Sequence, residues 1–249
     1  MSLIIYEKKN CIACITLNRP EANNAYNNSM LRELEKAWYD FRDDDEVWVA
    51  ILTGAGKHFC VGPGVDSLPK EHEQEPPTVH YGTIEIFKPV IAAVNGNAMG
   101  GGCSMALACD IRIAAENARF GYSQVRVGRI SRSGAYTLPR MTFPAMAMEM
   151  MLTGEAIGAQ EAYRVGLVNR VVPLKDLMSE ATKLAEKIAA NGPLAVRATK
   201  EALIRGQSMP FNQGIRMADL LRGRLIASED AVEGLKALKE KRAPIWKGQ

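Results

Sequence analysis

The sequence lacks the features that mark several large classes of protein. No apolar run approaches the roughly 18 residues that a membrane-spanning helix needs, and the early run at residues 3–5 is far too short for a signal peptide. Basic and acidic residues number 31 and 28, so the net charge of +3 is too small to indicate a nucleic-acid or membrane-surface partner. We therefore expect a cytoplasmic protein that binds neither nucleic acid nor a membrane.

Cysteine is also too sparse to indicate a disulfide or metal framework. The five cysteines are an odd number, which argues against a set of disulfides. Cys11 and Cys14 have C-x-x-C spacing, but they lie in an alternating apolar pattern typical of a strand, where residues i and i+3 point to opposite faces. No second pair follows, so we expect no metal site.

The remaining composition is that of an ordinary globular protein. Of 249 residues, 47% are hydrophobic and 24% charged. Strand and helix patterns alternate at first and helical patterns follow, which predicts an α/β core over residues 1–190 and a helical region over residues 191–249. Within these regions we expect a hairpin turn at residues 8–10, a helix over residues 174–190, and Ser228 as the N-cap of the last helix.

One stretch, residues 88–110, carries the clearest sign of chemistry. A short apolar run at residues 90–94 predicts a strand buried on both faces, and Gly100-Gly101-Gly102 then precedes a helical run at residues 103–109. A glycine turn that leads into a helix exposes unpaired backbone N–H groups and a partial positive charge, which together stabilise an anion. The alternative is a tight strand-to-helix turn without a ligand.

Further motifs decide between these readings. The segments Leu17-Asn18-Arg19-Pro20, 51–54, 59–62, 95–121 and 152–173, in this order, resemble the crotonase superfamily, the enoyl-CoA hydratase/isomerase family, from about Ile4 to Lys247. The resemblance implies a spiral of ββα units followed by a helical trimerisation region, assembled as a homotrimer or homohexamer. It also implies an acyl-CoA thioester as substrate, with coenzyme A as part of that substrate and no covalently bound cofactor.

The resemblance places the thioester carbonyl oxygen between two backbone N–H groups, and Gly101 matches the first. An alignment without a gap puts Pro63, which has no N–H, at the second. One inserted residue would bring in Gly64 or Val65, and the run Gly64-Val65-Asp66 then fits the family's small-x-Asp pattern. We expect Val65 to be the second donor; the alternative is a site with a single backbone donor.

Two positions depart from the hydratase pattern. Enoyl-CoA hydratases carry two glutamates that hold the water and move protons, and the matching residues here are Ser104 and Gln124. Neither can act as a carboxylate base, although both can hydrogen-bond a water or a substrate carbonyl. Because a general base contributes about 10²–10⁴-fold, ordinary hydration should be very slow unless another group substitutes.

Arg126, Arg129 and Arg132 recur at every third residue after Gln124. Arg132 matches a position that bears a catalytic aspartate in dienoyl-CoA isomerases of the family, so it is our main candidate for a side chain in the site. Its fixed charge suits a carboxylate or an enolate rather than proton abstraction. The alternative is that these arginines pair across a subunit interface. Tyr122 could donate a hydrogen bond to the site or simply fill the core.

The resemblance also assigns coenzyme A recognition to three parts of the chain: the turn after the Asn-Arg-Pro motif, the glycine loop and the C-terminal tail. The matching residues are Arg19, Ala22, Ala25, Gly64, Asp66, Lys241 and Trp246. For the tail, the alternative is a solvated basic helix end, because cations favour helix C-termini in any case.

These observations predict an acyl-CoA-handling enzyme that stabilises a thioester enolate with backbone amides, with Gly101, Ser104, Gln124 and Arg132 at the reacting end. Because both usual glutamates are replaced, two alternatives stay open. One is a catalytically silent paralogue that binds acyl-CoA. The other is a decarboxylase or C–C hydrolase of the crotonase type, which needs only enolate stabilisation.

Overall fold

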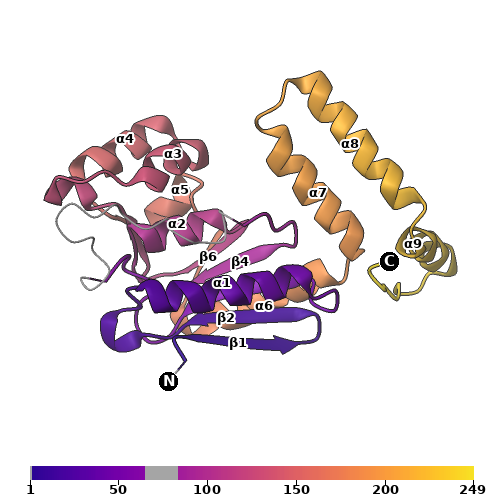
Figure 1. Cartoon of the computed structure of the whole chain (residues 1–249), viewed down its shortest axis with the longest axis horizontal. Helices are drawn as coiled ribbons and strands as arrows, with labels where there is room; N and C mark the ends of the chain where they lie inside the picture. The colour runs from indigo at the N-terminus through magenta and orange to yellow at the C-terminus, as the bar shows by residue number, and fades with distance from the viewer. Residues whose placement is uncertain (1, 65–83) are drawn as a thin grey trace.

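The computed structural model describes residues 2–64 and 84–249. Its core is a six-stranded sheet in which every neighbouring pair is parallel except the first (Figure 1). The strands, in spatial order, are β1 (Ile4–Lys9), β2 (Ile12–Leu17), β3 (Val49–Gly54), β4 (Val90–Val94), β6 (Ile111–Ala115) and β9 (Arg170–Val172). All five residues of β4 are buried, as the sequence predicted for the central strand.

The β1–β2 hairpin turns later than expected. The prediction placed the turn at residues 8–10, but Lys9 still pairs with Ile12, and the turn consists of Asn10 and Cys11. Both have positive φ, 50° and 64°, which is the conformation of a two-residue type I′ turn. Asn tolerates this conformation well, so the strand continues through the two lysines.

Helices cover both faces of the large sheet. On one face α1 (Asn28–Asp43) buries Trp38 and Phe41 in the main core, and its N-cap Asn27 accepts a hydrogen bond from the Met30 N–H at 2.9 Å. On the other face α6 (Leu177–Ala189) packs its apolar side against a second cluster from β3, β4 and β6. The predicted single helix over residues 174–190 is instead a short 3-10 turn, Leu174–Asp176, followed by α6, since 3-10 turns are frequent at helix starts.

A second, small sheet leads into the glycine-rich helix. It contains β5 (Ala98–Met99), β7 (Arg119–Gly121) and β8 (Ile157–Gly158). The helix α2 (Gly101–Ala108) follows β5 after a single residue. It begins two residues before the predicted Cys103, because Gly100, with φ of 52°, forms the N-cap and lets the chain turn directly from β5 into the helix.

Three further helices lie around α2 on the same side of the sheet (Figure 1). They are α3 (Arg132–Met141), α4 (Pro144–Thr153) and α5 (Ala159–Arg164). α2 packs on α3, and α3 packs on α4. The first turn of α3 is thereby brought against the first turn of α2, which matters for the site below.

The last helices stand apart from the sheet. In Figure 1, α7 (Pro193–Gly206) and α8 (Phe211–Ile226) form a helical hairpin, and α9 (Glu229–Glu240) lies beyond it. Ser228 caps α9 by accepting a hydrogen bond from the Ala231 N–H at 3.1 Å, which confirms the predicted cap. Among the helices that the structure describes, none combines the length and apolar character needed to cross a membrane.

Candidate active site

The site is built around the N-terminus of α2. The Gly100 N–H donates to Gly121 O of β7 at 2.8 Å, and the Gly100 carbonyl accepts the Ser104 N–H at 3.0 Å. Gly101 is the first residue of the helix, a position where the N–H has no acceptor within an α-helix. A Cβ on Gly101 would collide with the hydroxyl of Tyr26, so only glycine fits beneath that ring.

The loop at residues 60–64 runs alongside this helix start. Cys60 bridges to Ala98, with the Met99 N–H donating to Cys60 O at 2.9 Å. A Cβ on Gly62 would lie 3.4 Å from the Gly101 nitrogen, which shows how closely the loop backbone approaches it. The two glycine-rich segments that the sequence singled out therefore lie side by side.

The hydrogen bonds of this loop narrow the choice of a second backbone donor. Tyr26 pairs with Pro63 in a parallel bridge, and the Gly64 N–H donates to Tyr26 O at 2.9 Å. Gly64 is thus occupied and Pro63 has no N–H, which leaves Val65 of the candidates considered. Val65 and Asp66 lie outside the described residues, so both assignments stay predictions.

Behind the helix start lies a cluster of hydroxyl groups. Ser104 Oγ is 2.8 Å from Ser133 Oγ and 3.1 Å from the Tyr122 hydroxyl. Ser104 is 3% exposed and Tyr122 1% exposed. Burial raises the pKa of Tyr122 well above its usual value, so its phenol stays protonated. Tyr122 fills the core and hydrogen-bonds Ser104, and a hydrogen bond from its hydroxyl to a ligand stays a prediction.

Gln124 reaches the same turn from another direction. It opens the 3-10 helix Gln124–Val127, just after β7, and its side chain lies against Gly100, where a Cβ would meet Nε2 at 2.7 Å. Its Oε1 is buried and has no hydrogen-bond partner among the described residues. Ser104 and Gln124, 20 positions apart in sequence, therefore both adjoin Gly100.

The three arginines after Gln124 differ in their positions and contacts. Arg132 is the first residue of α3 and is exposed. Arg126 is turned toward α4, where its Nε donates to Thr153 O at 3.3 Å and its guanidinium lies 3.9 Å from a Glu155 oxygen. Arg129 is exposed in the connection before α3. None of these observations tests a catalytic role.

Sequence reasoning missed Ser133. Ser131 is the N-cap of α3, with its Oγ 3.3 Å from the Gly134 nitrogen, which places Ser133 in the first turn of the helix. A Cβ on Gly134 would lie 2.5 Å from the Tyr122 ring, so the first turn of α3 lies flat on that ring. A Ser-x-Ser-Gly helix start was a signal that could have indicated this close approach.

The residues predicted to hold coenzyme A fall into two groups. Arg19, Ala22 and Ala25 belong to one turn, which Asn24 ties to the neighbouring loop through Nδ2 bonds to Ala55 O and His58 O at 2.9 and 2.7 Å. This loop leads directly into residues 60–64. The turn, the loop and the α2 N-terminus thus form one continuous region.

The C-terminal group lies elsewhere. Lys241 is the C-cap of α9, and Trp246 donates from Nε1 to Ala190 O at 2.8 Å, with its ring against Gly192 and Gly234. Figure 1 shows α9 at the far right, beyond α7 and α8, whereas the loop that joins β2 to α1 lies at the left. A single chain does not bring Lys241 and Trp246 together with the Arg19 turn.

The cysteines take no part in a visible metal site. All five are free, and Cys60, Cys103 and Cys109 are buried. Burial raises the pKa of Cys60 and of Cys103 to about 12, so neither is a reactive thiolate at neutral pH. Over residues 2–64 and 84–249, no group of three or more His, Cys, Asp or Glu side chains is arranged to hold a metal ion.

Comparison with known proteins identifies the family of this chain. The family model for enoyl-CoA hydratase/isomerase matches residues 7–249. A relative, (E)-benzylidenesuccinyl-CoA hydratase of Thauera aromatica, is 43% identical over 256 residues, which cover 98% of this chain and 99% of the relative. Carnitinyl-CoA dehydratase of Salmonella typhi is 42% identical over 249 residues, with 94% of each covered. The crystal structure of enoyl-CoA hydratase from Mycobacterium tuberculosis H37Rv matches with a TM-score of 0.92 at 34% identity and full coverage of both chains.

The chain belongs to the enoyl-CoA hydratase/isomerase family and has the crotonase fold. It is an acyl-CoA enzyme of that superfamily, and the predictions of the family and of the α/β crotonase fold are confirmed, whereas trimerisation through the helical region stays a prediction. The relatives are named as hydratases and dehydratases, which fixes the class of enzyme and leaves the reaction of this chain to be proposed.

Proposed function

We propose that this chain binds an acyl-CoA with the thioester carbonyl oxygen on the Gly101 N–H, and that Val65 supplies a second N–H. The main supporting observation is that residues 60–64 lie close to the N-terminus of α2. The first amide of this helix, that of Gly101, has no acceptor within the helix. Negative charge that develops on this oxygen in the enolate would be stabilised by fixed donors, each worth about 3 kcal/mol.

Because Ser104 and Gln124 stand where hydratases carry glutamates, the site favours a substrate that is more reactive than an ordinary enoyl-CoA. The side chains that hydrogen-bond Ser104 are hydroxyls, and Gln124 adds an amide, so proton transfer by a glutamate pair is not part of the proposal. We propose a substrate that bears a carboxylate on its acyl group, which the positive charge of Arg132 would hold. The name of the Thauera relative, a substituted succinyl-CoA hydratase, supports this class. Hydration or dehydration is the first choice, and decarboxylation or C–C cleavage the alternative.

A catalytically silent protein is the other candidate. The same Ser104 and Gln124 motivate it, because a crotonase scaffold without its glutamates could bind acyl-CoA and do no chemistry. Such a protein would still need the Gly101 amide and the coenzyme A contacts.

The distribution of the coenzyme A residues supports self-assembly. The loop that joins β2 to α1 and helix α9 lie at opposite ends of the molecule (Figure 1), so the predicted set is complete only if the tail of another copy meets the Arg19 turn. We therefore propose a homotrimer or homohexamer in which residues 191–249 form the assembly region, separate from the core at residues 1–190.

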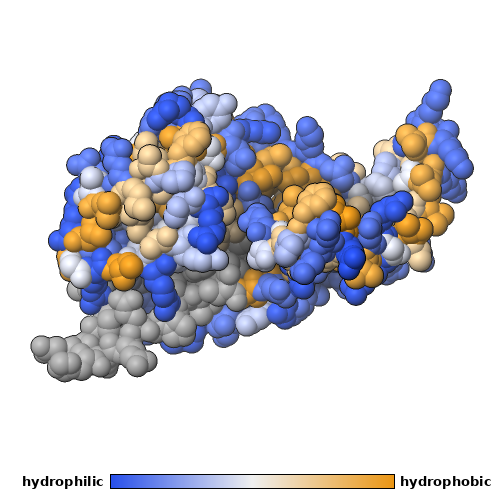
Figure 2. Space-filling view, turned by 90° about the horizontal axis from the view of Figure 1, so that it is seen from above, coloured by the Kyte–Doolittle hydropathy of each residue, from blue (hydrophilic) through white to orange (hydrophobic). Residues whose placement is uncertain are grey.

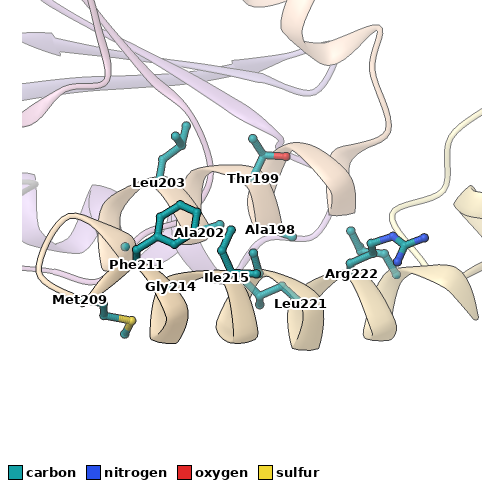
Figure 3. A pocket seen from close by; sticks show the side chains of 13 residues that line it. Ala198, Thr199, Ala202, Leu203, Met209, Phe211, Gly214, Ile215, Leu221 and Arg222 are labelled. Carbon is teal, nitrogen blue, oxygen red and sulfur yellow. The ribbon is translucent and has the colours of Figure 1, made fainter.

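The C-terminal helices offer apolar surface for such assembly. A hollow of about 450 Å³ lies between α7 and α8, open to one side and lined mainly by apolar side chains (Figure 3). Leu203 and Phe211 at its edge are 65% and 80% exposed, and Figure 2 shows hydrophobic residues gathered over this part of the surface. Exposed apolar side chains that gather in one place are typical of protein–protein contacts.

A panel of acyl-CoAs tests the proposed function. The purified chain is offered crotonyl-, acetoacetyl- and carboxyacyl-CoAs, with turnover followed by mass spectrometry and binding by calorimetry. The proposal predicts binding of several CoA esters and turnover of a carboxyl-bearing one. Binding without any turnover would establish the silent alternative, and no binding at all would contradict both.

Sedimentation tests the assembly. We expect a trimer or hexamer for the wild type, and a shift toward monomer for Phe211→Ser, which removes an exposed apolar ring from the proposed contact. Tyr39→Ser, at a 40% exposed aromatic on α1, serves as the matched control. A monomeric wild type would contradict the assembly while leaving the acyl-CoA proposal intact.

A further inference from the structure

Ser133 is the outer end of a chain of hydroxyl groups that runs from the protein core to the candidate site. Tyr122, 1% exposed, bonds to Ser104, and Ser104 bonds to Ser133 at 2.8 Å. Ser133 is only half buried, unlike Ser104 and Tyr122. It stands directly after Arg132 in the first turn of α3.

The three hydroxyl groups of Tyr122, Ser104 and Ser133 carry more protons than the hydrogen bonds between them use. Three hydroxyls carry three protons, and the two O···O contacts between them use two. The neighbouring Thr137 hydroxyl contributes none, because it donates to the Ser133 carbonyl at 2.9 Å. The remaining proton can go from Tyr122 to Cys103 or Thr137, which also hydrogen-bond its hydroxyl, to Gly100 O, which Ser104 reaches only at 3.4 Å, or outward from Ser133. An acceptor placed beside Ser133 would take that proton in a shorter bond than Gly100 offers.

We propose that Ser133 determines specificity by donating a hydrogen bond to a carboxylate on the acyl group of the substrate. This rests on the proposed function, because it requires the acyl chain to lie along α2 and α3 from the Gly101 amide. Tyr122 and Ser104 act as positioning residues, because their hydrogen bonds fix the Ser133 oxygen and orient its proton toward the ligand.

A carboxylate is the acceptor that the surroundings favour. Among the described residues, the side-chain hydrogen bonds of Ser104 and Ser133 join neutral hydroxyl groups, and none of them involves a carboxylate. The adjacent Arg132 contributes positive charge to the same helix turn. A hydrogen bond to a charged group changes affinity by about 10- to 100-fold, against a few-fold to about 10-fold for a neutral one.

The test compares succinyl-CoA with butyryl-CoA, which have the same number of acyl carbons and differ in the terminal carboxylate. Dissociation constants for both are measured by calorimetry on the assembled full-length protein. We expect the wild type to bind succinyl-CoA more tightly. Ser133→Ala should reduce that preference by about tenfold while leaving the butyryl-CoA constant within about twofold.

Two further variants separate specificity from folding. Ser133→Thr keeps the hydroxyl and should retain the preference for succinyl-CoA. Ser123→Ala removes an exposed serine with no cap bond in the preceding segment, and should change neither constant. Tyr122→Phe, which removes the inner hydroxyl, should lower the preference by a smaller factor than Ser133→Ala.

The outcomes distinguish this inference from the proposed function. If neither CoA ester binds the wild type, the proposed function fails and this inference with it. If both bind equally, or if Ser133→Ala weakens both by the same factor, the inference is overturned and the proposed function stands. A lost preference that Ser133→Thr restores supports the inference.

Discussion

Lys200 Nζ lies 2.7 Å from Asp110 Oδ2 and joins α7 to the residue between α2 and β6. The Lys200 side chain is 8% exposed, and its ammonium also donates to Lys88 O at 2.8 Å. Asp110 Oδ2 in turn accepts the Val90 N–H at 2.7 Å. The beginning of the C-terminal helices is thereby fixed to the strand that leads into the site.

Lys200→Met should destabilise the protein strongly. Removing one partner of a buried pair leaves the Asp110 carboxylate without its counter-charge, which costs about 3–5 kcal/mol of unfolding free energy. Urea denaturation measures this, with Lys187→Met at an exposed position of α6 as control. A change of less than about 1 kcal/mol would show that the pair does not fix α7 to the core.

Restoring two carboxylates should restore hydration. Ser104→Glu with Gln124→Glu places acidic groups on both sides of Gly100, and crotonyl-CoA hydration should rise by about 100-fold or more, the range of a general base. The increase is measured by loss of the enoyl-thioester absorbance. The control is Ser104→Gln alone, which adds similar bulk without charge. A folded double variant that gains no activity would show that more than the acid/base groups differs from a hydratase.

Arg132→Ala should reduce turnover of a carboxyl-bearing acyl-CoA by about tenfold or more, because a charge-assisted hydrogen bond is lost. Binding of free coenzyme A should change little, since Arg132 is not among the residues proposed to hold coenzyme A. Steady-state kinetics measure the first and calorimetry the second. Arg140→Ala, at an exposed position of the same helix, is the matched control. Equal turnover in Arg132→Ala and the wild type would contradict the assigned role.

The C-terminal tail should loosen in acid. The Arg242 guanidinium, at 2.6 Å, and the Ile245 N–H, at 2.8 Å, lower the pKa of Glu233 to about 2. Because the folded pKa lies below the unfolded value of about 4.3, the stabilising contribution is complete above that value and is lost as the pH falls toward 2. The NMR resonance of the indole of Trp246, which is close in sequence to Arg242 of the Glu233–Arg242 ion pair, should shift as the pH falls through this range. Glu233→Gln should abolish the shift; an unchanged titration in the variant would refute the assignment.

Much of the fold followed from local patterns. The alternating run of β2, the wholly apolar β4 and the caps at Asn27 and Ser228 are each determined within a few residues, and each was predictable. The glycine helix was also predictable, although its start was not, because Gly100 forms the N-cap through its positive φ. Backbone angles of this kind leave little trace in an apolar pattern.

The site was less predictable, because its contacts join distant segments. Ser104 and Ser133 are 29 residues apart and meet only because α3 lies on the Tyr122 ring, where Gly134 leaves room. The Gly64 N–H donates its hydrogen bond to Tyr26 O, 38 positions earlier in the sequence. Such contacts depend on how helices pack, and periodicity in one segment carries no information about its neighbour.

The central claim is that the Gly101 amide binds the oxygen of a thioester. A crystal structure of the chain with butyryl-CoA bound tests it most directly. The account predicts the thioester oxygen at about 2.7–3.1 Å from the Gly101 nitrogen, with the coenzyme A between the Arg19 turn and residues 60–64. A thioester bound elsewhere, with the Gly101 N–H donating to a group of the protein, would contradict it.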